Sequence, residues 1–358
     1  MKLGSLGSPD SLLVVRLGAM GDVLHTLPAV TALRAALPEI RIGWVVEERW
    51  AELLCAKHAD PWGPRNLSRP TVDRVHIVNT KSWRRAPFRS TTRRELSLAL
   101  AEIRGQKYQV AADFQGAIKS ALIAKAAGAR IIVGMDTPRE TLARLFYHQH
   151  VRCEARHVIE QYHGLAEAVA GCDLGKSAAQ LPLDASAEEP IARTIREWGG
   201  ELVIFSPGAG WGAKQWPAER YAEVARAVAG DGFRVVVNVG PGEQELARAM
   251  ENAAPQSIRR FSGSLGELIA LTRRARLFVG GDSGPLHLAA ALAIPVVAIF
   301  GPTDPARNGP YGTKQIVLRN PASRTSLSHT GRPDPGLRGI GSEEVILAVR
   351  RMLGESHA

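Results

Sequence analysis

The sequence predicts an α/β protein with two doubly wound parallel-sheet domains, and three observations lead to this fold class. Short apolar runs alternate with longer segments whose apolar residues recur at helical spacing. The alternation is lost over residues 173–190 and then starts again. With 358 residues, the chain is also long enough for two domains of ordinary size.

In the first half, a strand is predicted at each short apolar run. The first strand leads into a helix with Val23, Leu27, Val30 and Leu37 at helical spacing, and Pro38 ends this helix. The predicted strands are 12–15, 42–46, 75–78, 110–113 and 131–133, and we expect the last of them to close the series. Strands that alternate with helices form a parallel sheet covered on both faces.

The second half repeats the pattern after the boundary at 173–190. Its predicted strands are 202–205, 234–239, 277–279 and 295–300, and a loop rich in Pro, Gly, Ser and Arg is predicted at 301–341. The expected domains are 1–175 and 190–341. Residues 342–358 form a last helix, which we expect to pack back on the N-terminal domain.

The composition is that of a soluble globular protein, with 45% apolar and 22% charged residues. No apolar run is long enough for a transmembrane helix, and the Gly/Ser-rich start lacks the pattern of a signal peptide. Cys55, Cys153 and Cys172 show no metal-like spacing. They predict free thiols in a reducing cytoplasm.

The formal net charge is +10, and its densest part is the run Lys81, Arg84, Arg85, Arg89, Arg93 and Arg94. A solvated basic face is the interpretation that composition alone favours. Nucleic-acid binding is disfavoured, because only Trp83 and Phe88 are interleaved and no known nucleic-acid module surrounds the run. The third interpretation is a site for an anionic substrate or an anionic membrane surface.

The turn from Asp282 to His287 follows the apolar run 277–279 and the pair Gly280-Gly281, and it opens an Ala/Leu-rich helix. The first N–H groups of a helix have no partner inside it and favour an anion. Ser283, Gly284 and the two titratable side chains therefore predict a nucleotide-type ligand. The segment 301–305 after the next strand is expected beside them. An N-cap and a half-buried histidine are the structural alternative.

Two further turns carry polar side chains. Gly18-Ala19-Met20-Gly21-Asp22 lacks the full dinucleotide fingerprint, and on this pattern alone an N-cap is the better interpretation of Asp22. Lys214 follows the glycine-rich turn 208–212, where a phosphate site and an ordinary surface lysine are both open. Ligands of such sheets bind outside the carboxyl ends of the strands, where these turns gather. No zinc spacing or nucleophile motif is present, which favours a metal-free group transfer.

These residues resemble those of the ADP-heptose:lipopolysaccharide heptosyltransferases, which are family 9 glycosyltransferases of the GT-B fold. The resemblance runs over nearly the whole chain. Within the family, the stretches 44–48 and 134–136 favour the heptosyltransferase I type. The matching stretches are 20–29, 44–48, 113–120, 134–136, 145–147, 214–217, 282–284 with His287, and 301–305. The fold implied is two Rossmann-like domains that face a central cleft.

The resemblance implies an inverting transfer of L-glycero-D-manno-heptose from ADP-heptose to a Kdo sugar of a lipid A precursor. Asp22 matches the general base. The donor-binding residues implied are Lys214, Gly210, Glu243, Asp282, Ser283, Gly284, His287 and Thr303. The acceptor-binding residues implied are Lys81, Arg84, Arg85, Arg89, Asp113, Gln115, Lys119, Met135 and Asp136. No cofactor and no metal are expected.

The same resemblance implies a monomer on the cytoplasmic face of the inner membrane, where it meets a Kdo-lipid A acceptor and no nucleic acid. Ala209 and Gly210 stand where relatives often have a hydroxyl, and the segment 320–341 differs from the enterobacterial enzymes. Heptosyltransferase II or another family 9 sugar transferase is the alternative. A nucleotide-sugar epimerase or a non-catalytic nucleotide-binding module is the alternative from a different class.

Overall fold

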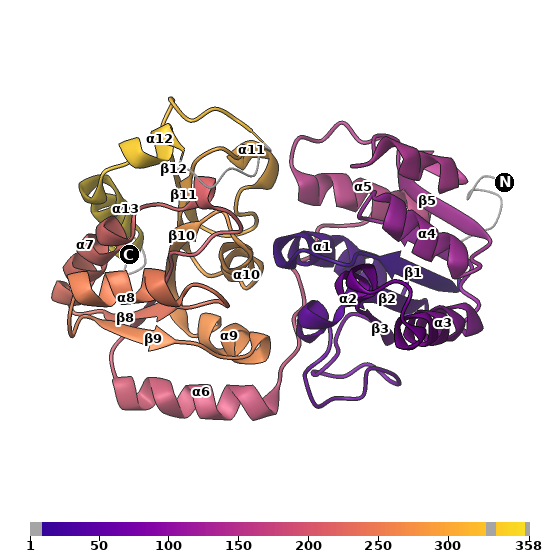
Figure 1. The fold of residues 1–358 in the computed structure, drawn as a ribbon, viewed down its shortest axis with the longest axis horizontal. Coiled ribbons are helices and arrows are strands. Elements are labelled where there is room, and N and C mark those ends of the chain that lie inside the picture. Colours follow the sequence, from indigo (N-terminus) through magenta and orange to yellow (C-terminus); the bar gives the residue numbers. More distant parts are fainter. Residues whose placement is uncertain (1–8, 327–333, 355–358) are drawn as a thin grey trace. The chain divides into compact units, whose positions relative to one another are not determined.

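The structure is a computed structural model that describes residues 9–326 and 334–354 (Figure 1). The chain divides between Asp184 and Ala185 into two compact units. Each unit contains one six-stranded sheet, and neighbouring strands in both sheets are parallel. Numbered from its own first strand, each sheet has the order 3-2-1-4-5-6, which is the dinucleotide-binding order of doubly wound folds.

The first sheet has the order β3-β2-β1-β4-β5-β6. Its strands are β1 (Ser11–Val15), β2 (Arg41–Glu47), β3 (Arg74–Val78), β4 (Val110–Asp113), β5 (Ile131–Met135) and β6 (Gln149–Val151). The central strand β1 is buried at every position, as expected for a strand covered on both faces.

Helices cover both faces of this sheet. On one face, α3 (Ser90–Gly105), α4 (Ile118–Ala126) and the 3₁₀ helix η3 (Thr141–Phe146) share a core with Leu13, Val15 and Val45. The short helix α2 (Thr80–Arg85) joins this core through Trp83. On the other face, α1 (Met20–Ala36) packs against α5 (Val158–Ala170), which lies on β4 and β5. The 3₁₀ helix η2 (Glu48–Leu53) follows β2.

The second sheet has the order β12-β11-β10-β7-β8-β9. Its strands are β7 (Leu202–Ser206), β8 (Arg234–Asn238), β9 (Ile258–Phe261), β10 (Ala275–Gly281), β11 (Val296–Phe300) and β12 (Gln315–Arg319). One face is covered by α7 (Ala218–Gly230), α8 (Gln244–Ala253) and α13 (Ser342–Gly354), and the other by α6 (Ala185–Trp198), α9 (Leu265–Thr272) and α10 (Gly284–Ala291). The short elements are η4 (Gly212–Lys214), α11 (Pro305–Asn308) and α12 (Pro335–Gly339).

Three strands differ from the sequence prediction, and all three are edge strands. The first series does not close at residue 133, because β6 adds a sixth strand. In the second sheet β9 and β12 were not predicted, and the segment 301–341 is not one loop, since it holds β12 and the short helices α11 and α12. An edge strand is half solvated, so its polar residues hide the apolar signal: β9 reads Ile-Arg-Arg-Phe.

The last helix corrects a further expectation. Val345, Val349 and Leu353 of α13 lie in the core of the second unit, together with residues of α7 and β10. The helix therefore belongs to the second unit, whose core it completes. The division at Asp184 falls inside the predicted boundary region 173–190, and it assigns all of α6 to the second unit.

Within the described ranges, no helix has the length and apolarity needed to cross a membrane.

Candidate functional site

Asp22 lies in the first turn of α1, directly after the loop that leaves the carboxyl end of β1. Its Oδ1 is 2.7 Å from an Nη of Arg16, and its Oδ2 accepts a 3.0 Å hydrogen bond from the N–H of Ala19. The second contact is the reciprocal half of an N-terminal capping box. The side chain of Asp22 is still 37% exposed. The carboxylate is therefore both oriented and accessible to a ligand.

Arg16 is the buried partner of this carboxylate, with a side chain only 5% exposed. Its Nη1 donates a 2.6 Å hydrogen bond to the carbonyl oxygen of Phe114, and its guanidinium carbon lies 5.2 Å from the ring centre of Tyr162. Burial opposes the charge of Arg16, but nearby Tyr162, Asp22 and Asp113 outweigh burial and raise its pKa. Arg16 therefore stays a cation that fixes Asp22 in place.

Asp113 and Gln115 organise the loop that follows β4, next to the loop of Asp22. Asp113 is buried at the end of β4, and four groups donate to its carboxylate: the N–H groups of Gln115 and Gly116 and the hydroxyls of Ser120 and Tyr147. Burial raises the pKa of Asp113 despite these donors. The side-chain oxygen of Gln115 accepts a 2.9 Å bond from the N–H of Leu17. Gln115 therefore ties its loop to the loop of Asp22, whereas Asp113 orders its own loop together with Ser120 and Tyr147, and neither side chain projects into solvent.

The remaining polar residues expected on this side lie at the same edge of the first sheet. Lys119 is exposed in the first turn of α4. Met135 and Asp136 are half-buried at the end of β5, and an oxygen of Asp136 lies 2.7 Å from Arg144. In a parallel sheet the carboxyl ends of all strands meet at one edge, so these residues share an edge with Asp22.

The basic run begins at this edge as well. Helix α2 follows the carboxyl end of β3, and Asn79 caps it by accepting a 3.3 Å bond from the N–H of Ser82. Lys81, Arg84 and Arg85 on α2 and Arg89 after it are all exposed. The structure thus places all nine residues of the expected acceptor set in the first unit. Seven of them reach the surface or are half-buried, whereas Asp113 and Gln115 are buried.

The second unit has its own polar cluster at the corresponding edge. Asp282 follows β10 and is buried; Lys214 donates to its Oδ2, and Nε2 of His287 lies 3.1 Å from its Oδ1. Burial alone would raise the pKa of Asp282, but His287 and Lys214 hold it well below its usual value. The Lys214 ammonium also lies 4.2 Å from the ring centre of Trp211. The cluster joins η4, β10 and α10.

Glu243 lies beside the glycine-rich turn that leaves β7. Its Oε2 accepts a 2.8 Å bond from the N–H of Gly240. A Cβ added at Gly208 would lie 1.8 Å from Oε1 of Glu243, so only glycine allows this approach. Burial raises the pKa of Glu243. Gly210 is exposed, and a Cβ there would meet no atom within 4 Å.

Two hydroxyls of this cluster are unsatisfied. Ser283 is the N-cap of α10, directly before Gly284, and Thr303 follows β11. Both hydroxyl oxygens are buried, and neither has a hydrogen-bond partner in the part of the chain that the structure describes. A buried polar group without a partner costs free energy, so these hydroxyls suit a polar ligand. With the N-terminus of α10, they form a cluster that fits a phosphorylated ligand.

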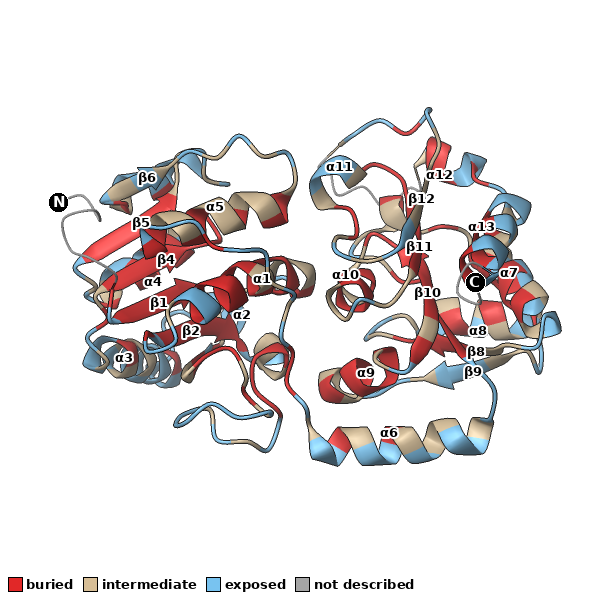
Figure 2. Ribbon diagram, turned by 180° about the vertical axis from the view of Figure 1, so that it is seen from behind, coloured by how far each residue is buried: buried red, intermediate tan, exposed pale blue. Residues whose placement is uncertain are grey.

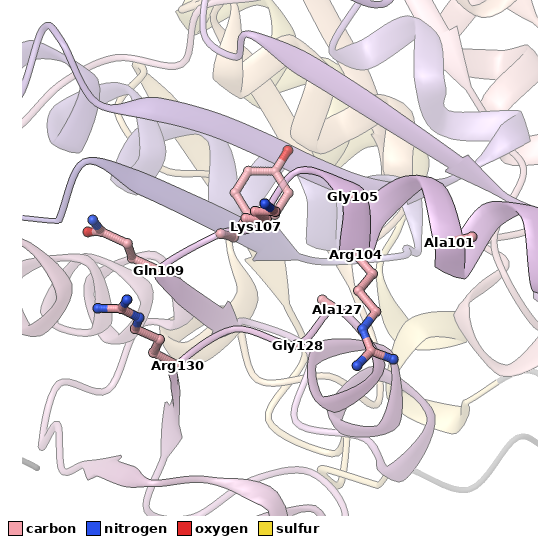
Figure 3. Close-up of a pocket in the computed structure, with 9 residues that line it drawn as sticks. Ala101, Arg104, Gly105, Lys107, Gln109, Ala127, Gly128 and Arg130 are labelled. Carbon is pink, nitrogen blue, oxygen red and sulfur yellow. The ribbon is translucent and has the colours of Figure 1, made fainter.

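A separate hollow of about 740 Å³ lies at the amino-terminal edge of the first sheet, opposite the edge that carries Asp22 (Figure 3). It lies between the C-terminal ends of α3 and α4, and its charged lining residues are Arg104, Lys107 and Arg130. It contains none of the site residues that the sequence predicted. Among the described residues, no group of three His, Cys, Asp or Glu side chains is arranged to hold a metal ion.

Comparison with known proteins identifies the family. The profile of Glycosyltransferase family 9 (heptosyltransferase) matches residues 98–333. The chain belongs to this family. It is 32% identical over 319 residues to lipopolysaccharide heptosyltransferase 1 of Escherichia coli, which covers 88% of this chain and 93% of that protein. The solved structure of Escherichia coli heptosyltransferase WaaC with ADP matches with a TM-score of 0.77 and 28% identity, over 96% of this chain and 99% of that chain.

Another branch of the family matches over a shorter length. Lipopolysaccharide heptosyltransferase 2 of Salmonella typhimurium is 30% identical over 164 residues, which is 44% of this chain and 46% of that protein. Family 9 membership makes this chain a glycosyltransferase with two Rossmann-like units, as the sequence predicted. The epimerase and the non-catalytic binding module are therefore disfavoured.

Arg16 is the residue of this family 9 site that sequence reasoning missed. A signal was available, since Arg16 stands at the end of the first predicted strand and opens the loop that ends in Asp22. Its contacts with Phe114 and Tyr162 join segments that are about a hundred residues or more apart, and no local pattern predicts them. Trp211, whose ring lies under the Lys214 ammonium, was missed as well, although it stands only three residues before that lysine.

Proposed function

We propose that this family 9 glycosyltransferase transfers L-glycero-D-manno-heptose from ADP-heptose to a Kdo sugar of lipid A precursor in the lipopolysaccharide inner core. The observation that carries the proposal is the 32% identity to lipopolysaccharide heptosyltransferase 1 over 88% of the chain. The proposal assigns the acceptor to the first unit and the donor to the second.

In the proposed reaction, an acceptor hydroxyl oxygen attacks the anomeric carbon of the heptose. The bond between this carbon and the diphosphate oxygen breaks on the opposite side, so the configuration inverts. Asp22 takes the proton of the hydroxyl, a role for which its orientation by Arg16 and its exposure are suited. A positioned general base typically contributes ~10²–10⁴-fold in rate.

ADP leaves with the electron pair of the broken bond, and its charge must be neutralised. The ammonium of Lys214 and the N-terminus of α10 are the cationic groups of the second unit assigned to the diphosphate. Ser283, Thr303 and His287 bind other donor oxygens, and Glu243 accepts from the ribose hydroxyls. No metal is needed, and activity in EDTA tests this part.

The deciding experiment uses the full chain with ADP-heptose and Kdo₂-lipid A, and mass spectrometry of the lipid. The expected result is the mass addition of one heptosyl group and the release of ADP. No addition to this acceptor, with addition to one that already carries a heptose, would instead assign the heptosyltransferase II activity. NMR of the new glycosidic linkage tests inversion.

The proposed location is the cytoplasmic face of the inner membrane, where the protein acts as a peripheral monomer. The lipid-linked acceptor and the basic run of the first unit support this location. Cell fractionation with a high-salt wash tests the peripheral association, and sedimentation velocity tests the monomer.

A further inference from the structure

The exposed apolar side chains of this protein are gathered in the first unit. Phe88 is 83% exposed between α2 and α3, and Leu145 is 79% exposed on η3. Leu96 and Leu98 on α3, Leu122 on α4 and Leu142 on η3 are exposed as well. The described part of the second unit has one comparable side chain, Leu347. Exposed apolar patches of this kind mark interaction surfaces.

These six side chains lie on a single side of the first unit, whereas its other exposed apolar residues, Trp62, Leu67, Ile77 and Leu183, belong to other segments. The helices α2, α3 and α4 and the 3₁₀ helix η3 all pack on the same face of the sheet, through the core that contains Leu13 and Val45. Of these helices, α3 buries only Thr92 and Ile103, and α2 buries no residue. Figure 2 draws most of α3 in the pale blue of exposed residues. We call the outer surface of these four helices the α2–η3 face.

The same face is strongly cationic. Residues 80–105 contain seven Lys and Arg and two Asp and Glu, a net charge of +5. Arg84, Arg85, Arg93 and Arg94 are exposed, and in the described ranges no ion pair joins any of them to an acid. The acids of these helices and their adjoining loop already have partners within the unit; they are Glu95, Glu102, Asp136 and Glu140.

Positive charge extends over the full length of α3. This helix has 16 residues and is therefore about 24 Å long. Arg93 and Arg94 lie near its first turn, and at its other end Arg104, Lys107 and Arg130 line the 740 Å³ hollow. In Figure 3, Arg104 and Arg130 lie at opposite sides of this hollow. The hollow contains no acidic side chain, so it suits an anionic headgroup.

We infer that the α2–η3 face docks on a bilayer with anionic headgroups, with Phe88 and the leucines in the interface and the arginines on the phosphates. Charge complementarity selects this occupant: a protein partner would need an acidic surface, whereas an anionic bilayer supplies charge and an apolar layer together. The inference deepens the proposed function. It rests on that function in one respect, because a lipid-linked acceptor requires the enzyme to dock on a membrane.

Co-sedimentation with vesicles tests the inference without any acceptor. Vesicles of phosphatidylcholine and phosphatidylglycerol are expected to bind the full chain, and vesicles of phosphatidylcholine alone to bind it far less. Salt is expected to weaken the binding. Absence of binding to the anionic vesicles, or equal binding to both, would overturn the inference.

Charge reversal tests the face itself. Arg93→Glu with Arg94→Glu is expected to weaken vesicle binding at least about 30-fold, because the loss of each basic residue near an anionic surface is worth about a factor of five and the new carboxylates add repulsion. The matched control is Arg226→Glu with Arg248→Glu, two exposed arginines of α7 and α8 in the second unit. It is expected to weaken binding by less than about threefold. An equal loss in both pairs would mean that net charge alone drives binding, and the inference would be wrong.

The apolar contribution has a matched test. Leu142→Ala with Leu145→Ala, and separately Phe88→Ala, are each expected to weaken binding about tenfold. Leu347→Ala, 68% exposed on α13, is expected to change binding by less than about twofold. No difference between these variants would refute an apolar insertion.

Turnover separates this inference from the proposed function. Arg93→Glu with Arg94→Glu is expected to retain sugar transfer to a water-soluble acceptor without acyl chains. For the unmodified chain, transfer without binding to anionic vesicles would refute the docking face alone. Vesicle binding without transfer would refute the proposed function alone.

Discussion

The two units share one strand order, yet they treat the polar groups at the carboxyl edges of their sheets differently. In the first unit, Asp113 accepts four hydrogen bonds and Asp22 has two partners. In the second unit, the described partners leave the buried hydroxyls of Ser283 and Thr303 unsatisfied. The same fold therefore places polar groups at the carboxyl edge of both sheets. The side chains determine whether these groups satisfy one another or remain available to a ligand.

The solvent-exposed surfaces of the two units differ as well. The first unit exposes a cationic and apolar helical face, whereas the described second unit exposes Leu347 as its one large apolar side chain of this kind. We interpret the first unit as the part that meets a large, lipid-anchored acceptor, and the second as the part that encloses a small, charged donor. Each of the following changes tests one side of this contrast.

Asp22→Asn is expected to have the largest effect. The amide keeps the size of the carboxylate but cannot take the acceptor proton, so kcat should fall by ~10²–10⁴-fold. Binding of ADP-heptose should persist, because that role belongs to the other unit. Single-turnover kinetics with calorimetry of donor binding measures both quantities.

A matched control is Glu48→Gln, which changes an exposed carboxylate directly after β2 of the same sheet. It should alter kcat by less than about threefold. Near-normal turnover of Asp22→Asn would remove its assignment as the base, and equal losses in both variants would trace the effect to general charge.

Asp113→Ala should have the next largest effect, on stability. Four buried donors would lose their acceptor, and each unsatisfied group costs at least about 1 kcal/mol, so a loss of about 4 kcal/mol or more in the free energy of unfolding is expected. Urea titration, with circular dichroism as the readout, measures it.

Asp136→Ala is the control on the neighbouring strand. Its carboxylate is half-buried and has one ion pair with the half-exposed Arg144, so the same substitution should cost less than about 1 kcal/mol. If the two variants were equally stable, Asp113 would not be the support of this edge, and a direct acceptor contact would become the better account of it.

Two substitutions with smaller expected effects test whether the donor binds the second unit and the acceptor the first. Lys214→Ala should raise the donor KM about tenfold, because a charge-assisted hydrogen bond is worth about 1.5–3 kcal/mol. Arg84→Glu with Arg85→Glu should raise the acceptor KM about tenfold and change the donor KM less than about twofold. Steady-state kinetics with each substrate varied in turn measures the contrast. Parallel changes in both KM values for either variant would break the assignment of one substrate to each unit.

The sequence predicted the repeated architecture because central strands are buried on both faces and appear as continuous apolar runs. It missed β6 and β9 because an edge strand can mix polar and apolar residues, as in Gln149-His150-Val151. It missed β12, although this strand contains the apolar run 316–318, because the Pro- and Gly-rich segment around it was predicted as one loop. It placed α13 on the wrong unit, since the amphipathic pattern shows that a helix has a buried face but does not show which core that face completes.

The sequence predicted which loops carry the candidate site residues, but it did not predict the contacts between those residues. The turn after β10 indicated Asp282, because ligands of doubly wound sheets bind at such turns. The turns of Asp22 and Lys214 left a structural role open, and the roles expected for these two residues came from the family resemblance. The burial of Asp113 and the bridge made by Arg16 depend on contacts between loops far apart in the sequence. The α2–η3 face was visible only as a charge run, because exposure of a leucine is not encoded in its local pattern.

Glu243→Gln should have the smallest effect, and its sign differs from that of the other changes. Burial raises the pKa of Glu243 above the unfolded value of about 4.3, so the folded state prefers the neutral form. The stability that this preference contributes is fully present below about pH 4 and is lost as the pH rises through the folded pKa. At pH 8 the buried carboxylate is therefore a cost, which glutamine removes while its carbonyl can still accept from Gly240.

Glu243→Gln should therefore increase the free energy of unfolding at pH 8 by less than about 1 kcal/mol and leave it unchanged at pH 4. Urea titrations at both pH values measure this, with the exposed Glu245→Gln as a control that should change neither. Calorimetry should show weaker ADP binding by Glu243→Gln, because a carboxylate accepts from two ribose hydroxyls and an amide oxygen does so less well. A gain in stability with no loss of ADP affinity would mean that the second unit keeps this carboxylate for a ligand other than the nucleotide.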